Sequence, residues 1–87
     1  MEVRDAVSAM QAAIQRTDRA TTALRLSEKA LDLGRQAFQA GDSTVLTLNL
    51  YEQATLEAKL QVINATADFF KARAAFHAAI GYLPGEQ

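Results

Sequence analysis

The chain has 87 residues, which is enough for one small domain. Its net charge is −1 and its basic residues are scattered singly, so we expect neither nucleic acid nor an acidic membrane surface as a partner. The absence of cysteine excludes disulfides and thiolate chemistry, and no apolar run approaches the roughly 18 residues that a membrane-spanning helix needs.

The composition favours long helices that pack closely. Eighteen alanines and ten leucines stand against six aromatic residues, and alanine combines the highest helix propensity with a small side chain. The helix breakers gather at Gly41 and in the last residues of the chain. We therefore predict an all-α chain with one internal turn and a C-terminal stop over residues 81–87.

A first helix is predicted over residues 2–40, where Gly34 alone departs from good helix formers. Apolar residues and threonines recur at alternating steps of four and three, the pattern of a heptad seam. The seam consists of Val3, Val7, Met10, Ile14, Thr17, Thr21, Leu24, Leu31 and Phe38. A second line beside it holds only small residues: Ala6, Ala13, Ala20, Ser27 and Gly34. Small residues at this period let two helix backbones approach closely, which explains a glycine inside a helix.

The turn is predicted at the tip 41–43. Gly41 suits the left-handed position that ends a helix, and Asp42 and Ser43 are both good N-caps for the next one. So short a connection makes the two helices antiparallel.

A second helix is predicted over residues 43–80, with three lines of apolar or small residues at seven-residue spacing. The first is Leu48, Thr55, Val62, Phe69 and Phe76; the second is Leu56, Ile63 and Phe70; the third is Tyr51, Ala58, Ala65, Ala72 and Ala79. This surface is wider than one partner helix can cover. We therefore expect an antiparallel two-helix coiled-coil hairpin that packs into a helical bundle or a wall of helices.

No residue pattern indicates catalysis, a metal site or a cofactor. His77 is the only histidine, and Ser43 lies near the opposite end of the second helix from it. The stripe of Phe69, Phe70 and Phe76 is typical of packing rather than of a ligand site. We expect a protein that is not an enzyme.

The tip is the candidate functional site. Phe38, Val45 and Leu46 surround it within one or two helical turns. Two interpretations remain open: these residues form a hydrophobic staple that closes the loop, or they belong to a docking surface for helices of another protein. The candidate partner-binding residues are Phe38, Gly41, Asp42, Ser43 and Thr44.

The sequence around the tip resembles the outer-membrane efflux protein family (TolC-like). Residues 30–48 read ALDLGRQAFQAGDSTVLTL, close to the family's A-L-x-L-A-x-x-x-Y/F-x-A-G-x-x-S run. Residues 52–58 (EQATLEA), 68–72 (DFFKA) and 76–81 (FHAAIG) are similar to later parts of the same repeat. The resemblance covers nearly the whole chain and favours the second, C-terminal hairpin repeat.

The resemblance implies a fragment of a larger channel protein. Family members are trimers with a periplasmic α-helical tunnel in Gram-negative bacteria, and the tunnel tip meets the hairpins of a periplasmic adaptor protein that links it to an inner-membrane pump. Gly41, Asp42, Ser43 and Thr44 would then lie at the inner tip of the tunnel. Many relatives carry aspartates just after the tip, where this chain has Thr47 and Leu50, so an acidic gate is not expected here.

Two functions follow as hypotheses. In the first, the chain is a tunnel segment of an efflux or secretion channel whose tip docks an adaptor. In the second, it is a generic self-associating coiled-coil scaffold without a transport role. For the isolated chain we expect a dimer or a higher oligomer, because exposed apolar seams associate.

Overall fold

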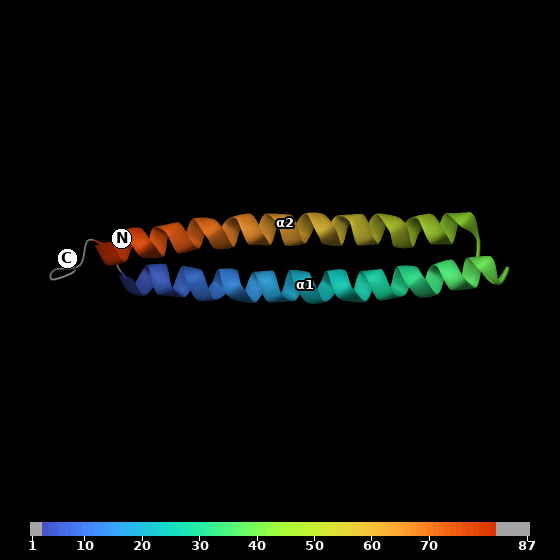
Figure 1. Cartoon of the computed structure of the whole chain (residues 1–87), viewed down its shortest axis with the longest axis horizontal. Helices are drawn as coiled ribbons and strands as arrows, with labels where there is room; N and C mark the ends of the chain where they lie inside the picture. The colour runs from blue at the N-terminus through green and yellow to red at the C-terminus, as the bar shows by residue number, and fades with distance from the viewer. Residues whose placement is uncertain (1–2, 82–87) are drawn as a thin grey trace.

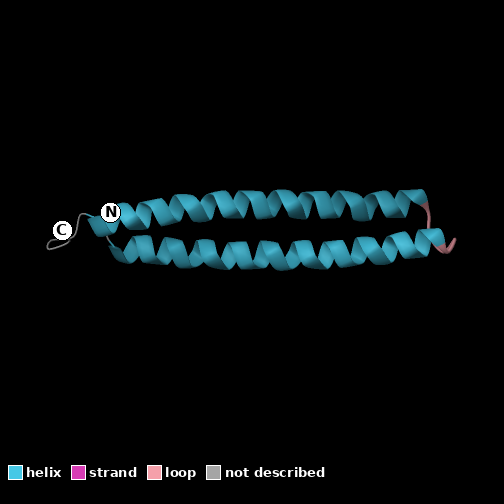
Figure 2. Cartoon of the chain, viewed as in Figure 1, coloured by secondary structure: helices cyan, strands magenta, loops and turns pink. Residues whose placement is uncertain are grey.

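The computed structural model describes residues 3–81, and this part of the chain is an all-α antiparallel hairpin (Figures 1 and 2). Helix α1 spans Val3–Gln39 and helix α2 spans Val45–Gly81, with 37 residues each. The hairpin measures 67 × 17 × 13 Å, so it is one helix long, two helices wide and one helix thick. The predicted fold class is confirmed.

The helix boundaries differ slightly from those expected. The first helix ends at Gln39 rather than at residue 40, and the second begins at Val45 rather than at residue 43. Gly81, predicted to stop the second helix, is its last residue. Glu2 and the remainder of the predicted C-terminal stop lie outside the described residues.

The small-residue line of α1 faces α2 along the full length of the hairpin. Ala6, Ala13 and Gly34 are buried, and Ala20 and Ser27 are half-buried. On the other side of the interface, Ala58, Ala65 and Ala79 of α2 are buried as well. Because alanine and glycine occupy the contact positions of both helices, the two backbones approach closely, as the sequence pattern predicts.

Larger residues complete the contact surface of each helix. On α1 these are Val3, Met10, Thr17, Leu24 and Leu31; on α2 they are Leu48, Thr55, Val62, Phe69 and Phe76, all of them buried or half-buried. We call these residues, together with the small-residue lines, the hairpin seam. Since the steps between them alternate between three and four residues, the seam is that of a coiled coil.

One part of the predicted seam is wrong. Ile14, Thr21 and Phe38 are exposed. The hairpin pairs the line of Met10 and Leu24 with the alanine line on one side of it, not with the Ile14 line on the other. Both choices satisfy the heptad spacing, but the alanine side allows closer backbones and so more contact along the whole helix.

Two seam threonines set the register of the helices. Thr55 Oγ1 donates to the carbonyl of Ser27 across the interface at 3.2 Å and to that of Tyr51 in its own helix at 3.0 Å. Thr17 Oγ1 lies 3.0 Å from the carbonyl oxygen of Ala13 and 3.4 Å from that of Ala65 on the opposite helix. Because each hydroxyl also donates to a carbonyl of its own helix, these residues are accommodated in the seam without an unpaired polar atom.

Between residues 3 and 81, neither helix is long and apolar enough to cross a membrane.

Candidate functional site

The tip begins with a Schellman motif at the end of α1. Gly41 has φ of 81°, the left-handed conformation that glycine adopts without strain. The amide of Asp42 donates to the carbonyl of Ala37 at 2.8 Å, and the amide of Gly41 donates to that of Phe38 at 3.0 Å. These two bonds satisfy carbonyls that the helix end would otherwise leave unpaired, so the backbone of the tip is fixed.

Thr44 is the N-cap of α2, instead of the predicted Asp42 or Ser43. Its Oγ1 accepts a hydrogen bond from the amide of Thr47 at 3.2 Å, and its carbonyl accepts one from the amide of Leu48 at 3.1 Å. The Schellman motif extends as far as Asp42, so the chain needs two more residues before it can enter a helix. The cap is therefore Thr44, the residue directly before the first helical residue, Val45.

The apolar residues next to the tip remain largely in solvent. Val45 is 56% exposed and Leu46 is 71% exposed, so they do not fold over the loop as a closing staple. The staple position before the N-cap is occupied by Ser43, which has no apolar side chain to contribute. The hydrophobic staple, one of the two interpretations of these residues, is therefore not formed.

A shallow groove of about 280 Å³ lies between the helices beside the tip. It is lined by small and apolar residues together with the polar side of the loop: Ala30, Leu33, Gly34, Ala37, Asp42, Ser43, Thr47 and Tyr51. Gly34, which has no side chain, is one of the lining residues, and a Cβ added to it would lie only 2.7 Å from Cδ2 of Tyr51. The ring of Tyr51 therefore packs directly against the α1 backbone and forms one wall of the groove.

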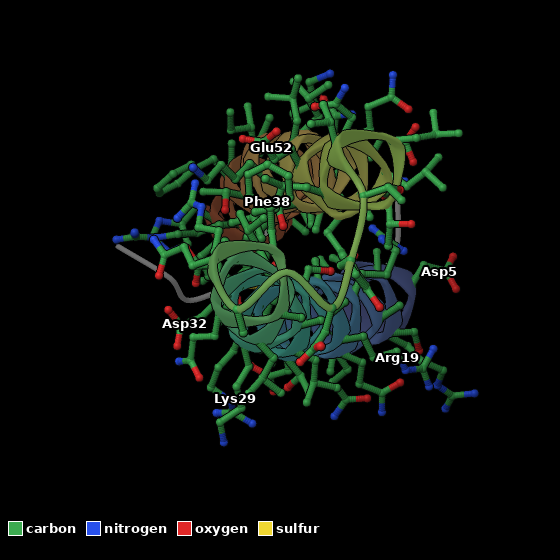
Figure 3. All side chains as sticks on the ribbon, turned by 90° about the vertical axis from the view of Figure 1, so that its right-hand side faces the viewer. Asp5, Arg19, Lys29, Asp32, Phe38 and Glu52 are labelled. Atoms are coloured by element: carbon green, nitrogen blue, oxygen red, sulfur yellow. The ribbon has the colours of Figure 1, made fainter. Side chains whose placement is uncertain are left out.

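The structure brings only part of the predicted site together. Asp42 and Ser43 line the groove, whereas Gly41 and Thr44 form the exposed backbone of the loop. Phe38 is partly exposed at the end of α1 and is not among the lining residues (Figure 3). Sequence reasoning missed Gly34, Thr47 and Tyr51 as groove residues. The sequence did contain a signal for two of them. Gly34 belongs to the small-residue line of α1, and Tyr51 begins the facing line of α2 that continues with alanines.

The outward side of α2 is a second candidate surface. Exposed residues follow a heptad spacing along the helix, and the middle of this line is apolar. We call this the α2 outer stripe; it comprises Leu46, Asn49, Gln53, Leu56, Leu60, Ile63, Ala67, Phe70, Ala74 and His77. At 100° per residue the stripe lies about 160° from the hairpin seam, on the opposite side of the helix.

The outward side of α1 has a different character. Charged side chains, including Lys29 and Asp32, project from α1 into solvent (Figure 3). A narrower line of small and apolar residues lies about 100° from the seam. This α1 outer stripe comprises Ala9, Ala12, Arg16, Arg19, Ala23, Leu26, Ala30, Leu33 and Ala37. The arginines interrupt it at mid-helix.

Charges contribute little to the hairpin itself. Arg35 and Glu52 approach to 4.0 Å across the helices, with both side chains about half exposed. An ion pair of this kind stabilises a protein by about 0–1 kcal/mol. Within the described part of the chain, no three histidine or acidic side chains are grouped closely enough to hold a metal ion.

A scan against protein-family models, a search of curated proteins and a search of solved structures each gave no match.

Proposed function

We propose that the chain is a hairpin segment of a helical tunnel wall in an outer-membrane efflux or secretion channel, and that its tip docks a periplasmic adaptor protein. The role is structural rather than catalytic. It places the chain in the periplasm of a Gram-negative cell, within a trimeric channel. The sequence resemblance around the tip names the family for this proposal, and the surface of the hairpin supports it.

The observation that carries the proposal is the second apolar stripe on α2. A helix in a two-helix hairpin has one neighbour and needs one apolar face, whereas a helix in a wall has a neighbour on each side. Leu56, Ile63 and Phe70 are more than half exposed on the side of α2 that faces away from α1. A helix that is apolar on two opposite sides is expected between two other helices.

The tip supports the docking part of the proposal. The Schellman motif and the Thr44 cap hold its backbone in one conformation, which favours binding because little ordering is then required. The groove beside it combines small residues at its base with Asp42 at its rim. Such a surface fits the closely packed end of another helical hairpin with a donor or a cation near its turn.

A binding measurement tests the docking. The isolated helical hairpin of a periplasmic adaptor protein is titrated against the wild-type chain and two variants by calorimetry. Asp42→Arg reverses the charge at the tip and should weaken binding at least tenfold. Asp18→Arg makes the same substitution on α1, far from the tip, and should leave the affinity unchanged.

The second candidate function, a self-associating scaffold, predicts a different result. A scaffold does not bind a partner through its turn, so both variants should then behave like the wild type. None of the three chains should bind the adaptor hairpin. Far-ultraviolet circular dichroism on both variants checks that the helices are intact. Equal binding by all three chains would contradict the tip as the docking site.

A further inference from the structure

The α2 outer stripe is a largely apolar surface that the hairpin leaves uncovered. It runs over residues 46–77, which is more than four heptads, and every residue in it is exposed. Leu56, Leu60, Ile63 and Phe70 form its centre, each more than half exposed. Apolar residues at heptad spacing argue for a coiled-coil interface, and in this stripe they are concentrated between Leu56 and Phe70. The stripe therefore matches the length and spacing of a coiled-coil interface.

We propose that in the isolated chain, whose α2 has no tunnel-wall neighbour, a second copy covers the stripe, with α2 packed against α2 of the copy in antiparallel orientation. The product is a row of four helices in which the two α2 helices are central and the two α1 helices are peripheral. This arrangement agrees with the difference between the helices, because α1 carries its charged residues on the side that would remain in solvent (Figure 3).

The flanking charges decide the orientation. In heptad terms Leu46, Gln53 and Leu60 occupy a positions, and Leu56 and Ile63 occupy d positions. One flank of the stripe then holds Leu50, Glu57, Asn64 and Lys71, and the other holds Glu52, Lys59, Thr66 and Arg73. Each flank has an acid toward the tip and a cation toward the far end.

An antiparallel partner brings the acidic end of each flank against the basic end of the same flank on the other copy. With Leu60 opposite Ile63 of the partner subunit, Glu57 meets Lys71 of the partner subunit, and Glu52 meets Arg73 of the partner subunit. The symmetry doubles both contacts. A parallel partner would instead place Glu52 beside Glu57 of the partner subunit, twice, with no opposite-charge pair in return. Apolar contact provides the affinity, and the charges select the direction.

Glu57 is the better of the two acids for a test. Glu52 already lies 4.0 Å from Arg35 within the hairpin, so changing it would disturb the monomer too. Within residues 3–81, neither Glu57 nor Lys71 takes part in an ion pair. Glu57 is exposed and has no charged residue three or four positions away on its helix.

The first experiment measures the dimer by sedimentation equilibrium. Wild type should be dimeric at about 100 µM, because an exposed apolar stripe favours association. Glu57→Lys should raise the dissociation constant about tenfold, because two attractions become two repulsions. The double variant Glu57→Lys with Lys71→Glu should restore it, since the pairs are exchanged rather than lost. Asp18→Lys changes net charge equally on α1 and should have no effect.

The second experiment measures the orientation directly. The chain has no cysteine, so Ser43→Cys places one spin label at each tip. In the antiparallel dimer the two labels are separated by 37 residue positions, about 55 Å at 1.5 Å per residue. A parallel dimer would bring them within about 20 Å, and Glu57→Lys would then strengthen association instead of weakening it.

Leu60→Lys tests the surface itself. It introduces a charge at the centre of the stripe and should leave a helical monomer, whereas Leu26→Lys on α1 should remain dimeric; the two leucines are 52% and 58% exposed. A monomeric wild type, or a short distance between the tips, overturns the proposal. The tunnel-wall role and this dimer both depend on the stripe, whereas adaptor docking depends on the tip, so adaptor binding by monomeric Leu60→Lys shows whether docking and dimer formation fail separately.

Discussion

Gly34 and Tyr51 form the closest contact that the structure records for a glycine of the hairpin. An added Cβ would lie 2.7 Å from Cδ2 of the ring, which is too close for a real contact. Glycine normally destabilises the middle of a helix by about 1 kcal/mol relative to alanine. Its presence here is explained by the ring that occupies the space of the missing side chain.

Gly34→Ala should therefore behave differently with and without the ring. In a Tyr51→Ala background it should stabilise the hairpin by about 1 kcal/mol, the ordinary difference in helix propensity. With Tyr51 present, the ring must move out of its contact, and the gain should be lost. The coupling energy from urea unfolding of the four proteins is the measurement. Equal effects in both backgrounds would mean that the ring does not need the glycine.

Gly41 is required for its backbone conformation and not for space. Its φ of 81° is left-handed, and nothing lies within 4 Å of an added Cβ. Gly41→Ala should destabilise the hairpin by about 1 kcal/mol because of the strain in that conformation alone. Gly81→Ala is the control, since Gly81 also has open space around it but no positive φ. If both substitutions change the urea midpoint equally, strain at the turn is not the cause.

At the scale of the helices, small contact residues determine how closely α1 and α2 pack. Ala13 is 0% exposed, and its neighbour Ala12 faces solvent on the same helix. Ala13→Leu should destabilise the hairpin by about 1–3 kcal/mol, because the larger side chain forces the backbones apart. Ala12→Leu adds the same atoms outside the seam and should change stability by less than about 0.5 kcal/mol. Thermal unfolding of both variants makes the comparison.

The sequence was sufficient to predict the helices, the turn and the close approach. Long runs of good helix formers are broken only at Gly41, and two lines of small residues mark the surfaces that meet. It was not sufficient to decide which neighbouring line completes the seam. Ile14 and Thr21 on one side and Ala13 and Ala20 on the other have the same period, so the pattern alone could not rank them.

The details of the tip were also beyond the pattern. Asp42, Ser43 and Thr44 are all good N-cap residues, and the selection among them depends on where the preceding Schellman motif ends. The contact of Tyr51 with Gly34 depends on the register of two helices, which the cross-helix bonds of Thr17 and Thr55 help to fix. Register is a property of the packed pair, so no single helix reveals it.

At the scale of the whole molecule, the hairpin buries too little to be strongly stable by itself. Among residues 3–81, the buried hydrophobic side chains are five alanines and Leu31, and many larger apolar residues remain exposed. Small chains with so little interior are marginally stable unless they associate. The stability of this protein should therefore depend on its concentration.

If unfolding of the hairpin is coupled to dissociation of the dimer, mass action raises the melting temperature with concentration. For two 87-residue chains, a tenfold increase in concentration should raise Tm by about 4 °C. Calorimetry between about 5 and 500 µM is the measurement. Leu60→Lys should lower Tm and make it independent of concentration, while Leu26→Lys should retain the dependence, because only Leu60 lies in the α2 outer stripe. A wild-type Tm that stays constant across this range would show that the folded hairpin is stable without a partner, and would remove the energetic reason for covering the stripe.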